Sequence, residues 1–126
     1  MKIIRNNIIP FSGYKAMNLF GVLFVRGNAR IDDITLNHES IHSRQFVELM
    51  VLFAVASVLI RWWLPVFAPF AFYVWYVIEY LIHLARFKSH YLAYRRISFE
   101  REAYTHQTNI NYLSKRELFS FFEYMG

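Results

Sequence analysis

Two histidines and a glutamate in one short stretch, His38-Glu39-Ser40-Ile41-His42, are the residues of this chain best suited to chemistry. At about 100° per residue in an α-helix, His38 and His42 lie roughly 40° apart around the axis, so both imidazoles can reach one metal ion. Glu39 lies beside them and is placed to take a proton from an attacking water rather than to bind the metal. The chain has no cysteine, so a zinc ion must be held by histidine and carboxylate groups. The spacing therefore predicts a catalytic zinc site.

A long helix has to carry this motif. Thr35 and Asn37 are candidate N-caps just before it, and a mainly apolar run follows from Phe46 to Ile60. We expect one helix over residues 35–60, with the motif in its polar first turns.

A second apolar run, Trp62–Ile78, has no charged residue, and Pro65 and Pro69 suit the entrance of a helix more than its interior. We expect a second helix over residues 65–87, antiparallel to the first because the connection between them is short. Two adjacent runs with so little charge favour a pair of membrane spans over a soluble helical pair buried in an oligomer. The lipid bilayer is therefore the first expected partner.

The composition agrees with a membrane protein. Hydrophobic residues make up 56% of the chain and charged residues only 18%, which is an unusual balance for a soluble domain of this length. The net charge is +5, but the lysines and arginines lie at the edges of the apolar runs, so we expect no nucleic-acid partner. They are dense before the first run and after the second, while the connection has only Arg61. The positive-inside rule then predicts that both termini lie in the cytoplasm, and we expect the membrane to be a bacterial inner membrane. No signal peptide is apparent at the N-terminus.

The N-terminal residues 1–34 are expected to form an arm and a small β-hairpin. Leu19–Arg26 is rich in Val, Leu and Phe and is followed by Gly27-Asn28, a turn signal, so it is predicted to be a strand. Ala29–Ile34 is its expected partner. The arm, residues 1–17, is expected to turn near Pro10.

Residues 88–126 are expected to be a cytosolic region of one domain that spans residues 1–126. A third, amphipathic helix is predicted over Ile97–Tyr112. The aromatic tail after Ser114–Glu117 is expected either to dock on the protein or to lie at the membrane interface. The predicted fold is thus mainly α, with an antiparallel two-helix transmembrane hairpin, a third amphipathic helix and a small β-hairpin.

A catalytic zinc normally has three protein ligands and one open position, so a third ligand must come from outside the motif. Counted outward from Arg61, Glu79 and His83 of the second apolar helix lie at about the same depth as the motif histidines. Polar groups at such depth in a membrane are functional candidates by default. Glu79 and His83 can also pair with each other, or orient His38 or His42. The candidate ligands are Glu100, Glu102, Glu79, His83 and, less plausibly, His106.

The order of these features resembles that of the integral-membrane gluzincin metalloproteases, which include the CAAX-processing, HtpX-like heat-shock and β-lactam-sensor proteases. The resemblance covers residues 35 to about 106: the motif at a helix start, two apolar spans, and then Phe99-Glu100-Arg101-Glu102-Ala103-Tyr104, where the family has Glu-x-x-Ala-Asp. It implies a zincin-like core with Glu100 as the third zinc ligand. Tyr104 stands where the family usually has an aspartate that orients a zinc-binding histidine. That role is either lost or done by Glu79 or Glu102.

The resemblance also implies a substrate. In related zincins a peptide is added as a strand beside the edge strand above the motif helix, and Leu19–Arg26 occupies the matching place. The alternative is that this strand only packs its side chains over the helices. Tyr104, His106 and Arg101 are candidates to stabilise the oxyanion. The expected function is a zinc-dependent membrane peptidase in which Glu39 moves the proton.

Two other functions remain open at this stage. One is a non-catalytic membrane protein with a structural or vestigial zinc site, which would be favoured by a fourth protein ligand such as Glu79 or His83. The other is a di-iron oxidoreductase, prompted by the surplus of histidine and glutamate. It ranks lower because Glu79 and His83 are four residues apart, whereas the paired motif of di-iron proteins needs three.

Overall fold

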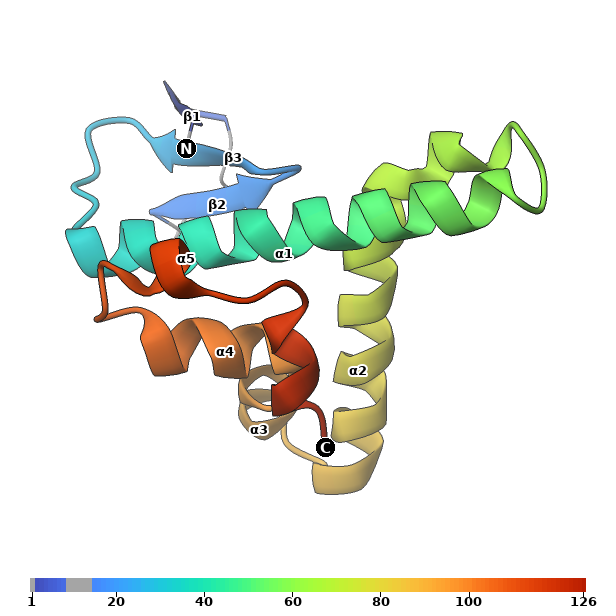
Figure 1. Cartoon of the computed structure of the whole chain (residues 1–126). Helices are drawn as coiled ribbons and strands as arrows, with labels where there is room; N and C mark the ends of the chain where they lie inside the picture. Colours follow the sequence, from blue (N-terminus) through green and yellow to red (C-terminus); the bar gives the residue numbers. More distant parts are fainter. Residues whose placement is uncertain (1, 9–14) are drawn as a thin grey trace.

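The computed structural model describes residues 2–8 and 15–126, and 62% of these are helical. The turn expected near Pro10 lies outside the described residues. In chain order the elements are β1 (Lys2–Asn6), β2 (Ala16–Leu19), β3 (Val22–Arg26), α1 (Asp33–Val58), η1 (Leu64–Phe70), α2 (Ala71–Phe87), α3 (His90–Arg95), α4 (Ser98–His106), α5 (Tyr112–Lys115) and η2 (Ser120–Tyr124). The small sheet lies on one side of α1, and α3, α4 and the C-terminal segment lie on the other (Figure 1).

The sheet differs from the predicted hairpin. Its strand order is β1-β3-β2, with β2 antiparallel and β1 parallel to β3. The chain reverses at Phe20-Gly21, where both residues have positive φ angles, so the predicted strand Leu19–Arg26 is split. The predicted partner Ala29–Ile34 is wrong, because it is not a strand and its last two residues begin α1. Gly27 instead ends β3, and its N–H donates to Asn6 of β1.

Helix α1 begins slightly earlier than predicted. Its N-cap is Asp32, whose carboxylate accepts a hydrogen bond from the Thr35 backbone N–H at 2.7 Å. A carboxylate at this position satisfies an otherwise unpaired N–H of the first turn. Thr35 and Asn37, the predicted caps, therefore lie inside the helix, and the Asn37 side chain is free to bond elsewhere.

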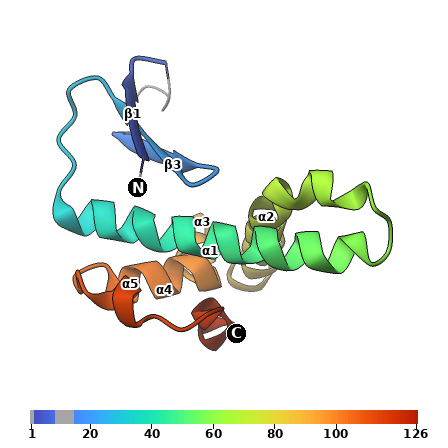
Figure 2. The same ribbon diagram turned by 45° about the horizontal axis from the view of Figure 1, so that its top comes forward.

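The two long apolar segments do not form the predicted antiparallel hairpin. Pro65 lies in the first turn of η1 and Pro69 inside it, and proline has no N–H to donate to an α-helical ladder. η1 therefore folds back against α1 as a 3-10 helix, and α2 then runs steeply across α1 (Figures 1 and 2). Asp33–Val58 and Leu64–Phe87 are each long and apolar enough to cross a membrane.

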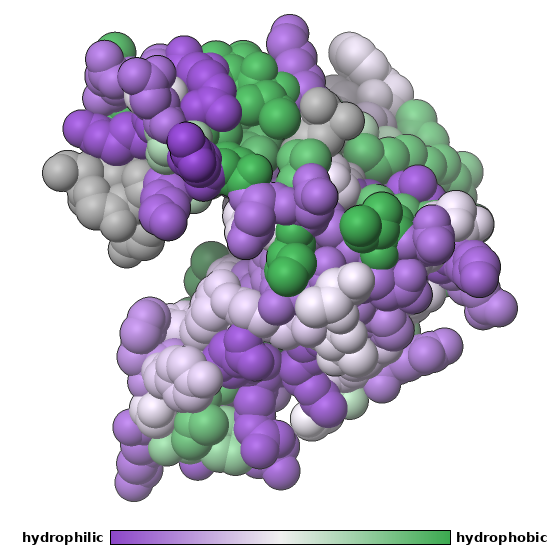
Figure 3. Space-filling model, turned by 90° about the vertical axis from the view of Figure 1, so that its left-hand side faces the viewer, coloured by the Kyte–Doolittle hydropathy of each residue, from purple (hydrophilic) through white to green (hydrophobic). Residues whose placement is uncertain are grey.

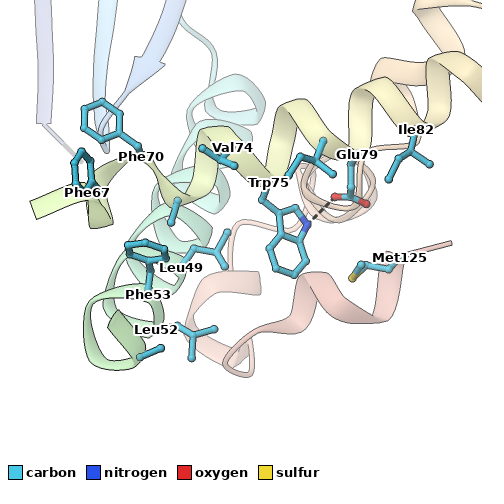
Figure 4. Close-up of a pocket in the computed structure, with 13 residues that line it drawn as sticks. Leu49, Leu52, Phe53, Phe67, Phe70, Val74, Trp75, Glu79, Ile82 and Met125 are labelled. Carbon is cyan, nitrogen blue, oxygen red and sulfur yellow. Dashed lines mark hydrogen bonds between the residues drawn. The ribbon is translucent and has the colours of Figure 1, made fainter. Parts of the chain in front are cut away.

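An apolar groove follows from this steep crossing. It has a volume of about 680 Å³ and is lined by side chains from α1, η1 and α2 together with Met125 (Figure 4). Its lining is almost wholly apolar. Glu79 lies at the groove, with its carboxylate accepting a hydrogen bond from the Trp75 indole at 3.1 Å.

The C-terminal region folds back onto α1 and α2. The predicted helix Ile97–Tyr112 is too long, since α4 ends at His106 and a separate turn, α5, begins at Tyr112. The aromatic tail docks on the protein, which was one of its two expected positions: Phe121 is fully buried. The core that it joins consists of Phe46, Leu49, Phe72, Ile97, Phe99 and Phe121.

Candidate metal centre

Three side chains from two helices converge on one point. His38 and His42 lie one turn apart on α1, and their Nε2 atoms are 3.1 Å from each other. Oε2 of Glu100, from α4, lies 3.3 Å from Nε2 of His38 and 3.4 Å from Nε2 of His42. All three residues are buried. This group could hold a metal ion.

Helix α4 delivers Glu100 because it lies antiparallel against the first turns of α1. At one end, the Asn37 side-chain amide donates to the backbone carbonyls of His106, Gln107 and Asn109. At the other end, the Gln45 amide donates to the Phe99 carbonyl at 3.2 Å. The Asn37 contacts satisfy carbonyls at the C-terminal end of α4, where no further helical turn supplies N–H donors. Glu100 is thus fixed between two anchors on α1.

Each histidine has a glutamine on its far side. Nδ1 of His42 is 2.8 Å from the side-chain oxygen of Gln45, and Nδ1 of His38 is 2.9 Å from that of Gln107. An amide oxygen can only accept, so an Nδ1 that faces it carries a proton, and Nε2 is the nitrogen left to bind a metal. Both Nε2 atoms face Oε2 of Glu100, which is buried. Burial lowers the pKa of His42, but the Glu100 charge raises it more, to about 9, so a proton lies between these two groups near neutral pH and a metal ion would replace it.

The spacing of these donors suits a small tetrahedral ion. Ligand bonds of about 2.0–2.1 Å at tetrahedral angles place neighbouring donor atoms about 3.3 Å apart. The three distances here lie between 3.1 and 3.4 Å. Two imidazoles and one carboxylate are also a donor set that zinc accepts. The residues fit such an ion without moving.

The second oxygen of Glu100 is held by a tyrosine. Oε1 accepts a hydrogen bond from the Tyr76 hydroxyl at 2.9 Å. Burial alone would raise the pKa of Glu100, but the adjacent His42 and His38 lower it more, so the carboxyl group has a pKa well below its usual range. Burial and the Glu100 charge raise the pKa of Tyr94. Glu100 is therefore a carboxylate, and Tyr94 beside it is a neutral hydroxyl.

Glu39 is half-buried, and its carboxylate has no hydrogen-bond partner among residues 2–8 and 15–126. Its backbone carbonyl accepts a hydrogen bond from the Asn18 side chain of β2 at 2.8 Å, which docks the sheet on the motif turn. Seen from the end where α1 begins, the surface is hollowed between the upper part with the sheet and the lower part with α3 and α4 (Figure 3). The motif turns of α1 run between these two parts (Figure 1).

Tyr104 lies against the metal-binding group. Its ring packs on His38 with ring centroids 4.5 Å apart, and its hydroxyl is 3.1 Å from that of Tyr94. The Arg95 guanidinium lies over the Tyr104 ring, 3.6 Å from its centroid. Tyr104 therefore positions one histidine by packing.

The other candidate residues lie elsewhere. His106 is hydrogen-bonded to the Tyr124 hydroxyl at 2.6 Å and stacks on Tyr112, so it is not in the metal-binding group. Glu79 accepts from Trp75 and Ser98. His83 is buried, and neither of its ring nitrogens has a partner among the described residues.

Two more predicted roles are changed by the structure. Glu102 is bonded to Gln45 and Arg116, so it is no metal ligand, although it does contact a residue that orients His42. Arg101 donates to the carbonyls of Tyr124 and Gly126. The predicted substrate edge Leu19–Arg26 is largely β3, which is paired on both sides and cannot accept another strand.

Sequence reasoning missed four residues of this site: Gln45, Tyr76, Tyr94 and Gln107. Gln45 lies one turn after His42, and Gln107 lies about two turns after Glu100, so helical spacing could have identified both. Tyr76 and Tyr94 reach the site from α2 and α3, and no local pattern marks them.

Comparisons with known proteins add no relative. No family model, no curated protein and no solved structure matches this chain.

Proposed function

We propose that this chain is a membrane zinc peptidase with one zinc ion held by His38, His42 and Glu100. The observation that carries the proposal is the convergence of three candidate ligand atoms at tetrahedral spacing, next in the chain to Glu39, whose carboxylate has no hydrogen-bond partner among the described residues. The resemblance of the motif and its order to the membrane gluzincins supports the same assignment.

A hydrolytic zinc site differs from a structural one in its ligand count. Structural zinc normally has four protein ligands, while catalytic zinc has three and an open position. The group formed by the described residues has three members. Glu79 and Glu102, the surplus carboxylates of the di-iron alternative, are bonded to other side chains. These observations favour the catalytic zinc site over both alternatives.

The residues of the site have separate roles in hydrolysis. Zinc, when bound, lowers the pKa of water toward about 7 and polarises the carbonyl that is attacked. Glu39 accepts the proton of the attacking water and passes it to the leaving amine. The hydroxyls of Tyr94 and Tyr104, one hydrogen bond apart, are candidate donors to the oxyanion.

The substrate is an extended segment of peptide. β3 is occupied on both sides, but β2 is an edge strand and is bonded through Asn18 to the motif turn. A peptide that pairs with β2 would be held by backbone hydrogen bonds whatever its sequence.

The bilayer is the proposed surroundings of the apolar half. Large apolar side chains are exposed along the second half of α1, along η1 and along α2, which is costly in water. The lysines and arginines lie mostly outside these segments, which under the positive-inside rule supports a cytoplasmic position of both ends.

The test is Glu39→Gln, an isosteric change that removes the base. Purified protein in detergent is loaded with zinc, its metal content is measured, and its activity is assayed on a quenched fluorescent peptide library. We expect unchanged zinc content and a fall in hydrolysis of about a hundredfold to ten-thousandfold. The control is Glu117→Gln, which alters an exposed glutamate outside the site and should leave the rate unchanged. Equal rates for the parent and Glu39→Gln, or no hydrolysis by the zinc-loaded parent, would overturn the proposal.

A further inference from the structure

A buried cluster of charged side chains lies beyond His42, on the side away from Glu100. Gln45, Glu102 and the Arg116 side chain are fully buried, and Glu48 is nearly so. Arg116 bridges the two carboxylates, donating to Glu48 and to Glu102. Glu102 also accepts hydrogen bonds from Tyr112 at 2.8 Å and from Gln45 at 2.7 Å.

This cluster decides which way the Gln45 amide faces. The atom that approaches Glu102 must be the NH₂ group, because a carboxylate only accepts, and the Phe99 carbonyl on the same side also only accepts. The oxygen of the amide is thereby turned toward His42. An amide oxygen requires a proton on Nδ1, so Nε2 of His42 is left with the lone pair that a metal needs.

The other histidine has no such support. Gln107, which contacts Nδ1 of His38, is half-buried, and its NH₂ group has no hydrogen-bond acceptor among the described residues. Nothing comparable to Glu102 therefore fixes the orientation of its amide. The site is asymmetric: one histidine is oriented by a buried ion cluster, the other by a single contact.

We propose that Glu102 is a positioning residue that acts through Gln45 to hold His42 in its metal-binding tautomer, with Arg116 fixing Glu102 in turn. The proposal rests on the metal site of the proposed function, but not on peptidase activity. Under this proposal the C-terminal segment that carries Arg116 contributes to the affinity of the site for zinc.

An isosteric substitution separates this role from simple packing. In Glu102→Gln, the new amide must turn its oxygen toward Arg116 and its NH₂ group toward Gln45. The Gln45 amide then has to reverse, so that an NH₂ group faces Nδ1 of His42. We expect zinc affinity to fall by about tenfold to a hundredfold, as for other groups that orient a ligand histidine. Gln45→Met, which removes the amide but leaves the ion cluster, is expected to lower it by a similar factor.

The experiment measures zinc affinity by chelator competition for both single variants and for the double variant, with apoprotein thermal stability recorded for each. If Glu102 acts through Gln45, the double variant loses no more affinity than Gln45→Met alone. The matched control is Glu48→Gln, which alters the same Arg116 cluster without touching Gln45. Glu48→Gln should lower thermal stability and leave zinc affinity within about threefold of the parent. That change is much smaller than the tenfold to hundredfold fall expected for Glu102→Gln.

Three outcomes would overturn the inference. They are multiplicative losses in the double variant, parent-like affinity in Gln45→Met, and a loss in Glu48→Gln as large as that in Glu102→Gln. If Glu102→Gln does not fold, the zinc affinity of Gln45→Met alone still tests the inference. A parent protein that binds no zinc would instead refute the proposed function, so the two failures can be told apart.

Discussion

At the scale of single residues, the site depends on where protons lie. His38 and His42 each turn one ring nitrogen toward a glutamine oxygen and the other toward the Glu100 carboxylate. Burial lowers the pKa of His42, but the Glu100 charge raises it more, so this imidazole holds a second proton in the metal-free protein near neutral pH. A bound dication would replace that proton.

The pH dependence of zinc binding follows from these protonation states. Burial lowers the pKa of His42, but the Glu100 charge raises it more, to about 9, so protons compete with zinc for Nε2 of His42 below that pH. The pKa of Glu100 lies well below its usual range, so its carboxyl group takes up no proton in the same interval. We expect zinc affinity to fall by about tenfold per pH unit as pH falls from about 9 toward 7. Chelator competition at a series of pH values measures the slope, and a zinc affinity that does not change with pH over this interval would contradict the account.

At the scale of elements, the site depends on how α4 is held against α1. The Asn37 amide reaches three carbonyls at the end of α4, and the Gln45 amide reaches a fourth at its beginning. These contacts are what places a glutamate from one helix opposite two histidines from another.

The variant Asn37→Ala removes the first of these anchors. Loss of its hydrogen bonds should lower the free energy of unfolding by about 1–3 kcal/mol. Zinc affinity should fall as well, because α4 carries Glu100. Chemical denaturation of the apoprotein and chelator competition give the two values. Asn111→Ala is the matched control. This exposed asparagine forms its hydrogen bonds through its own backbone N–H and carbonyl, so its substitution should change neither stability nor zinc affinity. A parent-like stability of Asn37→Ala would contradict the anchoring role.

Local patterns predicted the elements better than their pairing. The motif helix and the position of the second apolar helix follow from nearby residues. The three-ligand group needed one more piece of information, because Glu100 was chosen as the third ligand from the resemblance to the membrane gluzincins. The parallel pairing of β1 with β3 was not predictable, since it joins strands across fifteen or more residues of chain without a periodic signal. The end of α4 at His106 was missed because its cap, Asn37, lies about seventy residues earlier. Tyr76 and Arg116 were missed for the same reason: their partners are distant in sequence.

At the scale of the whole molecule, the chain divides into an apolar half and a polar half. The second half of α1, η1 and α2 expose large apolar side chains and enclose the groove of Figure 4. Figure 3 looks onto the end of the molecule where α1 begins with the motif, and hydrophilic residues cover most of that face. This division is what a bilayer around one half and water around the other would require.

The membrane assignment predicts a position-dependent cost for charge. Val77, 52% exposed on α2, would face lipid, and an arginine there should cost about 2.5–3.5 kcal/mol near the centre of a span. We expect Val77→Arg to lower the fraction of protein that resists alkaline extraction from membranes. Ile110→Arg, at an apolar residue 70% exposed outside the apolar half, should leave that fraction unchanged. A parent protein that purifies without detergent as a soluble monomer would contradict the assignment.

The metal content of the purified chain tests the central claim most directly. Native mass spectrometry of the detergent-solubilised parent, after addition of zinc and removal of excess ion, reports the number of ions per chain. A single site made by His38, His42 and Glu100 predicts one zinc per chain in the parent, and none in His42→Ala under the same conditions. No bound metal in the parent, two metal ions per chain, or one zinc retained by His42→Ala would contradict it.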